Sequence, residues 1–323
     1  MRFLSFRRAV VLAAVAAGLL AVPTAQAAST YTPVRGTDFF APSGVWNQPL
    51  AGNARLANNS RALVATLNAN FPAYVPYINT ASYSTPIYTV TAAQPTLHIT
   101  ADHADPKLVA DFNQVPLPDD ARPAQGTDGN LVLWQPSTQT MWEFWRLYKD
   151  ASGSWHAVWG GKMTNVSSNP GYYQGGYGAT ASSLPDVGGL MTLQEETDGV
   201  INHALAVAIP NPKAGTWVYP AQRTDGTSTA PNAIPEGTRF RLPASLNIDA
   251  LGLPRQTAMM AKAVQRFGMV VTDKAGAVTF KAEDPYLYTQ KFAFDPYAYL
   301  FGGVSSTTFL SVFPWQYLQV VKS

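Results

Sequence analysis

The chain has 323 residues, no cysteine, and 22 basic against 20 acidic residues, which excludes disulfides, thiolate nucleophiles and cysteine-ligated metals. A charge so close to balance also lacks the basic stripe that a nucleic-acid partner requires. Charged residues make up 13% of the chain and aromatic residues 12%, with 24 glycines and 25 prolines. This composition is typical of a β-rich domain, and about 300 residues can bury a sufficient core without disulfides.

The first 27 residues match an export signal. Three arginines within the first eight residues precede an apolar run over 9–22, and Ala25-Gln26-Ala27 supplies a small-x-small cleavage site. The run is shorter than the roughly 20 residues of a membrane-spanning helix. We therefore expect cleavage before Ala28, no membrane segment afterwards, and a secreted protein. The pair Arg7-Arg8 leaves both the general and the twin-arginine export routes open.

The first half of the mature chain contains one helix candidate and a hairpin. A helix is predicted over 54–69, where apolar side chains share one face and Pro72 follows. The turn Pro136-Ser137-Thr138-Gln139 separates two β-rich runs and predicts the hairpin. The strands expected in this half, in chain order, are 86–90, 96–100, 131–135, 140–148 and 155–159.

The second half continues the short strands and adds one well-marked helix. Pro254 opens this helix, Gly268 closes it, and an apolar stripe lies between them. The strands expected here are 201–209, 216–219, 240–242, 269–272, 278–281 and 309–321. The chain contains no repeat and no linker. We therefore predict a single domain over 28–323, a β-sandwich or jelly roll with two or so accessory helices.

Period-two alternation places Glu143 on an apolar strand face, beside Met141, Trp145 and Leu147. A carboxylate there is costly unless it is paired, and desolvation would raise its pKa. A raised carboxyl pKa suits a general acid at neutral pH, so Glu143 is a catalytic candidate. An ion pair with an arginine such as Arg223 is the structural alternative.

His203 is the second candidate, on the side of its predicted strand that carries the larger apolar side chains. It follows a cluster of acids, Glu195, Glu196 and Asp198. A histidine near carboxylates can act as a base, whereas a satisfied core histidine is the structural alternative. We take His203 and Glu195 as candidate catalytic residues.

Two aspartates lie in Asp-Gly turns beside predicted strands, Asp128 and Asp225. Asp128 is a catalytic candidate and Asp225 a substrate-binding one, although both could be ordinary turn residues. Arg223 could clamp a carboxylate or a hydroxyl-rich ligand. The loop over 165–181 is rich in glycine and tyrosine, and long loops are often functional. The candidate sugar-stacking residues are Tyr172, Tyr173, Tyr177 and Trp145.

Metal and cofactor motifs are weak in this sequence. Asp102-His103-Ala104-Asp105 superficially resembles a metal site, but it lacks the spacing of HExxH and any cysteine support. The sequence contains no GxSxG elbow, P-loop or Rossmann fingerprint. We therefore expect neither a metal nor a cofactor.

The ordered set of motifs FFAPSGVWN, WEFW, GVINHAL, PAQRTDG and PEGTRFRLP resembles a group of uncharacterised secreted actinobacterial proteins, over about residues 39–284. The resemblance carries no activity with it. It implies that Glu195 rather than Glu196 is the acid of its motif. Sequences of that group often have histidine at the position of Asn130, so an essential histidine there would imply altered chemistry in this chain.

Three functional hypotheses follow. The first is a secreted glycoside hydrolase that cleaves a polysaccharide, with Glu143 as acid and Asp128 or Glu195 as base or nucleophile. The second is a polysaccharide lyase in which His203 or a tyrosine removes a proton and Arg223 neutralises a uronate carboxylate. The third is a noncatalytic module that binds a carbohydrate or cell wall. In each case we expect a monomer with a polysaccharide or cell-wall glycan as partner, and the polymer remains open.

Overall fold

The structure, a computed structural model, describes residues 28–322. The expected export signal, residues 1–27, lies outside the described residues. Among the described residues no helix has the length and apolar character needed to cross a membrane.

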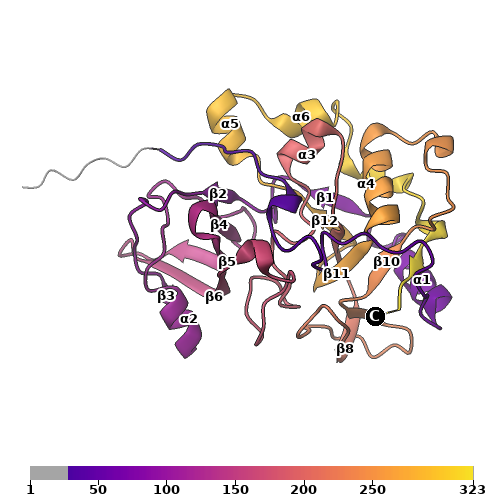
Figure 1. Cartoon of the computed structure of the whole chain (residues 1–323), viewed down its shortest axis with the longest axis horizontal. Helices are drawn as coiled ribbons and strands as arrows, with labels where there is room; N and C mark the ends of the chain where they lie inside the picture. The colour runs from indigo at the N-terminus through magenta and orange to yellow at the C-terminus, as the bar shows by residue number, and fades with distance from the viewer. Residues whose placement is uncertain (1–27, 323) are drawn as a thin grey trace, which may run out of the picture.

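The protein is mainly β, as predicted, and its strands form two main sheets that lie side by side (Figure 1). The order in the six-stranded sheet is β1 (Tyr77–Asn79), β12 (Thr279–Lys281), β7 (Leu205–Ile209), β11 (Met269–Lys274), β10 (Arg239–Arg241) and β13 (Gln319–Val320). The order in the five-stranded sheet is β2 (Ile87–Thr89), β4 (Leu131–Gln135), β5 (Thr140–Lys149), β6 (Trp155–Met163) and β3 (Thr100–Ala101). A small third sheet pairs β8 (Pro212–Trp217) with β9 (Ile234–Glu236).

The predicted hairpin is confirmed, because β4 pairs antiparallel with β5 and β5 with β6. Both main sheets are mixed. β2 runs parallel to β4 and β3 to β6 in one sheet, and β7 runs parallel to β11 and β1 to β12 in the other. These parallel pairs differ from the antiparallel sheets of a jelly roll, and they bring together strands that are far apart in the sequence.

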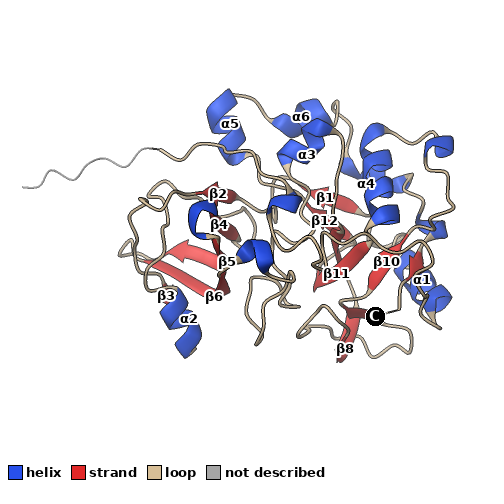
Figure 2. Cartoon of the chain, in the orientation of Figure 1, coloured by secondary structure: helices blue, strands red, loops and turns tan. Residues whose placement is uncertain are grey.

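The two predicted helices are present as α1 (Ser60–Asn68) and α4 (Arg255–Arg266). Further short helices are α2 (Pro106–Asp111), α3 (Leu193–Asp198), α5 (Tyr286–Phe292), α6 (Pro296–Leu300) and α7 (Ser306–Ser311). Figure 2 shows α3, α4 and α6 gathered along one side of the six-stranded sheet. Single 3₁₀ turns occupy Gly36–Asp38, Pro136–Thr138, Val166–Ser168, Asp249–Leu251 and Trp315–Tyr317.

Four predicted strands differ clearly from the structure. Only Thr100 of the run 96–100 is in a strand, and only Thr216 and Trp217 of the run 216–219 are. The run over 309–321 was expected to be extended, but only Gln319–Val320 is a strand, because α7 and a 3₁₀ turn precede it and Pro314 cannot join a ladder. The strand predicted to start at residue 201 begins only at Leu205. His203 therefore precedes the strand, and the alternation used to place its side chain does not apply.

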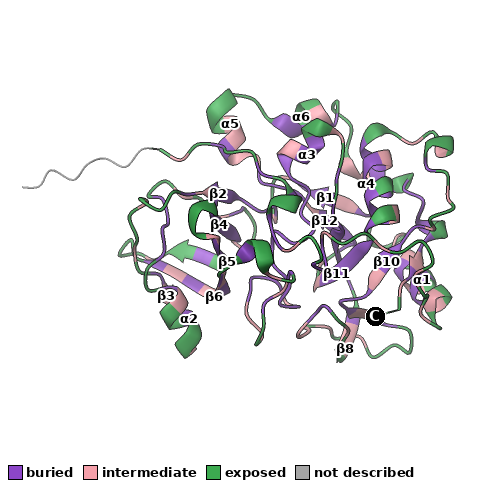
Figure 3. Cartoon of the chain, viewed as in Figure 1, coloured by how far each residue is buried: buried purple, intermediate pink, exposed green. Residues whose placement is uncertain are grey.

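The segment before α1 packs between the two sheets. Phe39, Phe40 and Trp46 are buried together with Trp134 of β4 and Val270 of β11. The indole Nε1 of Trp46 donates to the carbonyl of Gly171 at 2.8 Å. Figure 3 shows the strands of both sheets largely buried and the outer face of α5 exposed. The N-terminal segment thus helps to join the two sheets.

Candidate active site

Two cavities meet in a cleft between the two main sheets. The first, of about 480 Å³, is bordered by β5, β6 and the end of β11, and the second, of about 360 Å³, by β1, β12 and β11. Three residues border both cavities, namely Asp128, Asp273 and Lys274. Asp128 precedes β4 of one sheet, and Asp273 belongs to β11 of the other. The carboxylates therefore stand on opposite walls where the cavities join.

Asp273 reaches the cleft through an irregularity in its strand. β11 pairs in parallel with β7, and the register shifts between Val271 and Asp273. Such a bulge re-aims the following side chain, so Asp273 is only half-buried although Val271 is fully buried. Burial, with smaller contributions from the charges of Asp225 and Asp128 and against the opposing charge of Lys281, raises the pKa of Asp273 to about 7. A carboxyl group with this pKa can hold or release a proton at neutral pH.

Asp128 is held by the turn that leads into β4. Its backbone carbonyl accepts from the N–H of Arg146 at 2.6 Å, and the carbonyl of Gly129 accepts from the N–H of Leu147 at 3.1 Å. Gly129 has a φ of +46°, which glycine adopts readily. The side-chain Oδ1 of Asp128 accepts from the indole Nε1 of Trp145 at 3.4 Å. This fastens the carboxylate beside an aromatic ring.

Aromatic rings form the wall of the larger cavity. The ring of Trp159 stacks on Tyr177 with a centroid separation of 5.9 Å and an interplanar angle of 5°. His103 meets Trp159 edge-on at 5.8 Å. The guanidinium of Arg223 lies 5.3 Å from the Trp159 centroid, and its Nη2 donates to the carbonyl of Thr180 at 2.9 Å. Half-buried indoles with a neighbouring arginine are suited to stacking against a sugar ring.

Three carboxyl groups converge at one end of this cavity. Oxygen atoms of Asp225, Glu236 and Asp273 all lie within 4.8 Å of one another. Glu236 is 0% exposed, and neither of its carboxyl oxygens has a hydrogen-bond partner within residues 28–322. Burial, followed by Asp273 and Asp225, raises the pKa of Glu236 to about 9. A proton on Glu236 would reduce the repulsion within this cluster, and its oxygen atoms could also coordinate a hard cation such as Ca²⁺ or Mg²⁺.

An ion pair extends inward from the wall of the smaller cavity, which Lys281 borders. Lys281 Nζ donates to Asp186 Oδ1 at 2.6 Å, and Thr85 Oγ1 donates to Asp186 Oδ2 at 2.8 Å. Burial opposes the charge of Lys281, but the Asp186 carboxylate outweighs it and raises the lysine pKa. The amide of Asn130 donates to both Asp186 oxygens, and its own Oδ1 is buried without a partner in the cavity wall. Asn130 therefore anchors Asp186 at the wall of the larger cavity.

Glu143 has the predicted burial but does not border the cleft. Its side chain is 0% exposed, and Oε1 accepts from the N–H groups of Asp186 at 2.7 Å and Val187 at 3.3 Å. Burial, followed by Asp186, raises its pKa to about 8. The expected arginine partner is not found, since Arg223 binds backbone carbonyls instead. Glu143 ties the loop after residue 180 to β5.

His203 and Glu195 form a separate buried pair. His203 Nε2 lies 3.1 Å from Glu195 Oε2, and its Nδ1 lies 2.8 Å from the carbonyl of Ala204. Burial lowers the His203 pKa, but Glu195 outweighs it and the pKa is raised. Glu195 also closes the capping box of α3 with Thr192 and accepts from the N–H of Gly36. Neither residue borders the cleft, so the predicted shared cleft of Glu143 and His203 is not found.

Four of the turn and loop candidates lie together. Asp128, Trp145, Arg223 and Asp225 all border the larger cavity. The three tyrosines predicted to stack on sugars have different surroundings. Tyr177 stacks on Trp159, Tyr173 is buried, and Tyr172 packs edge-on against Tyr219 at a centroid distance of 5.7 Å.

The 102–105 cluster serves local structure. Asp102 accepts from Tyr148 at 3.1 Å and lies 2.9 Å from His156 Nδ1, while Asp105 caps the N-terminus of α2. His103 alone borders the cavity.

Sequence reasoning missed Asp273, Glu236, Trp159 and Lys281. Lys281 borders the cleft from the predicted strand 278–281, and Asp273 directly follows the predicted strand 269–272. An acid directly after four buried strand residues, three of them apolar, is the signal that could have identified Asp273.

No protein-family model matches the chain, and comparisons with curated proteins and with solved structures find no match. Function is therefore inferred from the chemistry of the cleft.

Proposed function

We propose that this chain is a secreted glycoside hydrolase that cleaves a polysaccharide in the cleft between its two main sheets. One observation carries the proposal: carboxylates from opposite walls, Asp128 and Asp273, stand where two cavities join. Glycosidases use a pair of carboxyl groups on either side of the scissile bond. A cavity on each side leaves room for sugar residues before and after that bond.

The two carboxyl groups differ in the way the reaction requires. Asp273, with its pKa raised to about 7, is the general acid that donates a proton to the departing glycosidic oxygen. Asp128, held by the Trp145 indole, is the second carboxyl group of the pair. It either removes a proton from the attacking water or attacks the sugar carbon itself, and the carboxyl separation in a complex would distinguish these outcomes.

The aromatic wall binds the sugar. Trp145 and Trp159 present half-buried indoles to the larger cavity, and Arg223 beside Trp159 is placed to donate to hydroxyl groups. Because stacking acts on ground and transition states alike, replacing Trp159 with alanine should raise KM more than it lowers kcat. A binding module would share the indoles but would not need an acid with a pKa near 7.

A polysaccharide lyase is the second candidate, favoured by two cationic side chains, Arg223 and Lys274, that border the cavity with Asp128. These could neutralise the carboxylate of a uronate while a base removes the neighbouring proton. A lyase yields an unsaturated product that absorbs in the ultraviolet, whereas a hydrolase yields reducing ends alone.

The test is incubation of the purified protein with a panel of neutral and acidic polysaccharides, read by reducing sugar and ultraviolet absorbance. On the active substrate, Asp273→Asn and Asp128→Asn should each lower kcat at least ~100-fold. Asp249→Asn is the matched control, because Asp249 is exposed and pairs only with Lys262. Full activity in either cleft variant would overturn the assignment, provided the variant melts as the parent does.

A further inference from the structure

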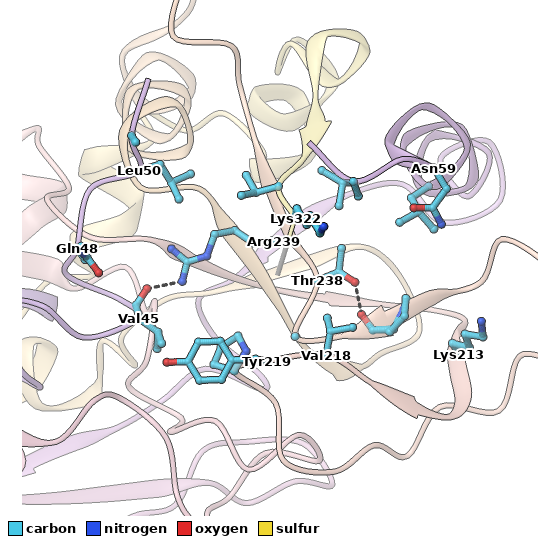
Figure 4. A pocket seen from close by; sticks show the side chains of 18 of the residues that line it. Val45, Gln48, Leu50, Asn59, Lys213, Val218, Tyr219, Thr238, Arg239 and Lys322 are labelled. Atoms are coloured by element: carbon cyan, nitrogen blue, oxygen red, sulfur yellow. Dashed lines mark hydrogen bonds between the residues drawn. The ribbon is translucent and has the colours of Figure 1, made fainter. Parts of the chain in front are cut away.

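Apart from the two cavities of the cleft, a cavity of about 570 Å³ opens beside β10 and β13 (Figure 4). It shares no residue with the two cavities of the cleft. Its walls come from the segment around Val45, from α1, and from the chain between β8 and β10. The volume falls within the range of small-molecule sites in proteins, about 300–1,000 Å³.

The charges in this cavity all have one sign. Lys213, Arg239 and Lys322 border it, and among residues 28–322 no aspartate or glutamate does. In Figure 4 the Arg239 guanidinium lies between Leu50 and Tyr219, with Lys322 close to its stem. The remaining wall is mostly aliphatic or proline, formed by Val45, Leu50, Leu63, Val218, Pro235 and Val320. The cavity is therefore apolar with a cationic centre.

Arg239 has carbonyl partners but no counter-ion. Its Nη1 donates to the carbonyl of Phe267 at 3.0 Å, and its Nη2 donates to the carbonyl of Val45. Among the described residues no carboxylate lies within salt-bridge distance of it. Burial lowers the pKa of Arg239 to about 10, which reflects the cost of an unpaired charge there. The two carbonyls orient the guanidinium, and an anion would complete its pairing.

We propose that this cavity binds an aliphatic monocarboxylate, a fatty-acid-type molecule, with its carboxylate on Arg239 and its chain along the aliphatic wall. The planar guanidinium matches a carboxylate better than any other anchor in the cavity. Flexible aliphatic walls, with Tyr219 the one aromatic side chain among the lining residues, fit an alkyl chain better than a rigid ring. This site acts independently of the glycosidase cleft, and its test requires no turnover.

Calorimetry of the purified protein with dodecanoate is the test, and we expect one bound molecule. Dodecanol, which lacks the charge, and acetate, which lacks the chain, should each bind at least ~10-fold more weakly. Arg239→Gln should lower the affinity for dodecanoate at least ~10-fold, the loss expected when a hydrogen bond to a charged group is removed. Arg255→Gln is the matched control, because Arg255 also donates to two backbone carbonyls but lies outside the cavity.

A second variant keeps the test decisive if Arg239→Gln does not fold. Leu50→Trp fills the apolar end of the cavity and leaves Arg239 in place, so dodecanoate binding should be lost while the melting temperature is kept. Absence of dodecanoate binding to the parent protein, equal affinity for dodecanol, or unchanged affinity in both Arg239→Gln and Leu50→Trp would overturn the proposal.

Discussion

Lys281 of β12 donates to Asp186 at 2.6 Å, and Asp186 also accepts from Asn130, which leads into β4 of the other sheet. The ion pair therefore joins the two main sheets at the wall of the cleft, which Lys281 borders. The Asp186 side chain is fully buried and that of Lys281 is 16% exposed. Removing one partner leaves the other charge buried without compensation.

We expect Lys281→Met to lower the free energy of unfolding by about 3–5 kcal/mol, the usual cost of breaking a buried ion pair on one side. Urea denaturation measures this. Lys262→Met removes the exposed pair with Asp249 and should cost less than about 1 kcal/mol. Equal losses in the two variants would show that the buried pair does not join the sheets.

Stability should fall as the pH rises from about 5 to 8. Burial raises the pKa of three glutamates, Glu143, Glu196 and Glu283, to about 8 each. Their pKa values in the unfolded chain are close to 4.3, so between these values the folded state binds more protons than the unfolded state. The stabilisation is present below the unfolded pKa and is lost as the pH rises through the folded pKa.

The measurement is the melting temperature in buffers from pH 5 to pH 9. Glu143→Gln should flatten part of the dependence, because glutamine keeps the acceptor for the Asp186 and Val187 N–H groups and cannot ionise. A melting temperature that is constant or rises over this range would contradict the prediction.

The buried ring of His203 leaves no room for a side chain at Gly36. A Cβ at Gly36 would lie 2.2 Å from His203 Nε2, and that ring is fully buried against Glu195. Gly36→Ala should therefore lower stability by about 1–3 kcal/mol, as overpacking does. Gly276→Ala meets nothing within 4 Å and should be neutral or slightly stabilising. If both variants melt alike, the His203–Glu195 pair does not hold the N-terminal segment.

Local sequence patterns predicted several of the strands and helices, whereas the positions of the cleft residues depend on pairing between distant strands. The hairpin of β4 and β5 was predictable because alternation and a four-residue turn are local signals. Glu143 was correctly expected to be buried. Alternation predicts which face of a strand carries a side chain, but it does not predict which face lines a cleft. Asp273 could not be placed from the sequence, because its direction depends on a bulge against β7, more than sixty positions earlier. His203 was placed wrongly because its strand begins two residues later.

We expect the stability of the carboxyl cluster to depend on an uncharged side chain at position 236. With its pKa raised to about 9, Glu236 carries a proton at pH 7. Glu236→Gln keeps the shape and the neutrality, so its melting temperature at pH 7 should stay within about 2 °C of the parent. Neither a chelator nor millimolar Ca²⁺ should change the parent value. If a chelator lowers the melting temperature of the parent but not that of Glu236→Gln, the cluster binds a cation instead.

The pH dependence of hydrolysis tests the role of Asp273. A general acid works only while it is protonated, so kcat/KM should decline as the pH rises through about 7. Asp225 is exposed, and its negative charge raises the pKa of Asp273. Asp225→Asn should therefore move the alkaline limb of the profile to lower pH, by about 0.5–1 unit, the size of a single nearby charge at a partly exposed site. Asp249→Asn should leave the limb in place. Because a change in substrate affinity alters the height of the profile and not its midpoint, an unmoved limb in Asp225→Asn would mean that a group other than Asp273 donates the proton.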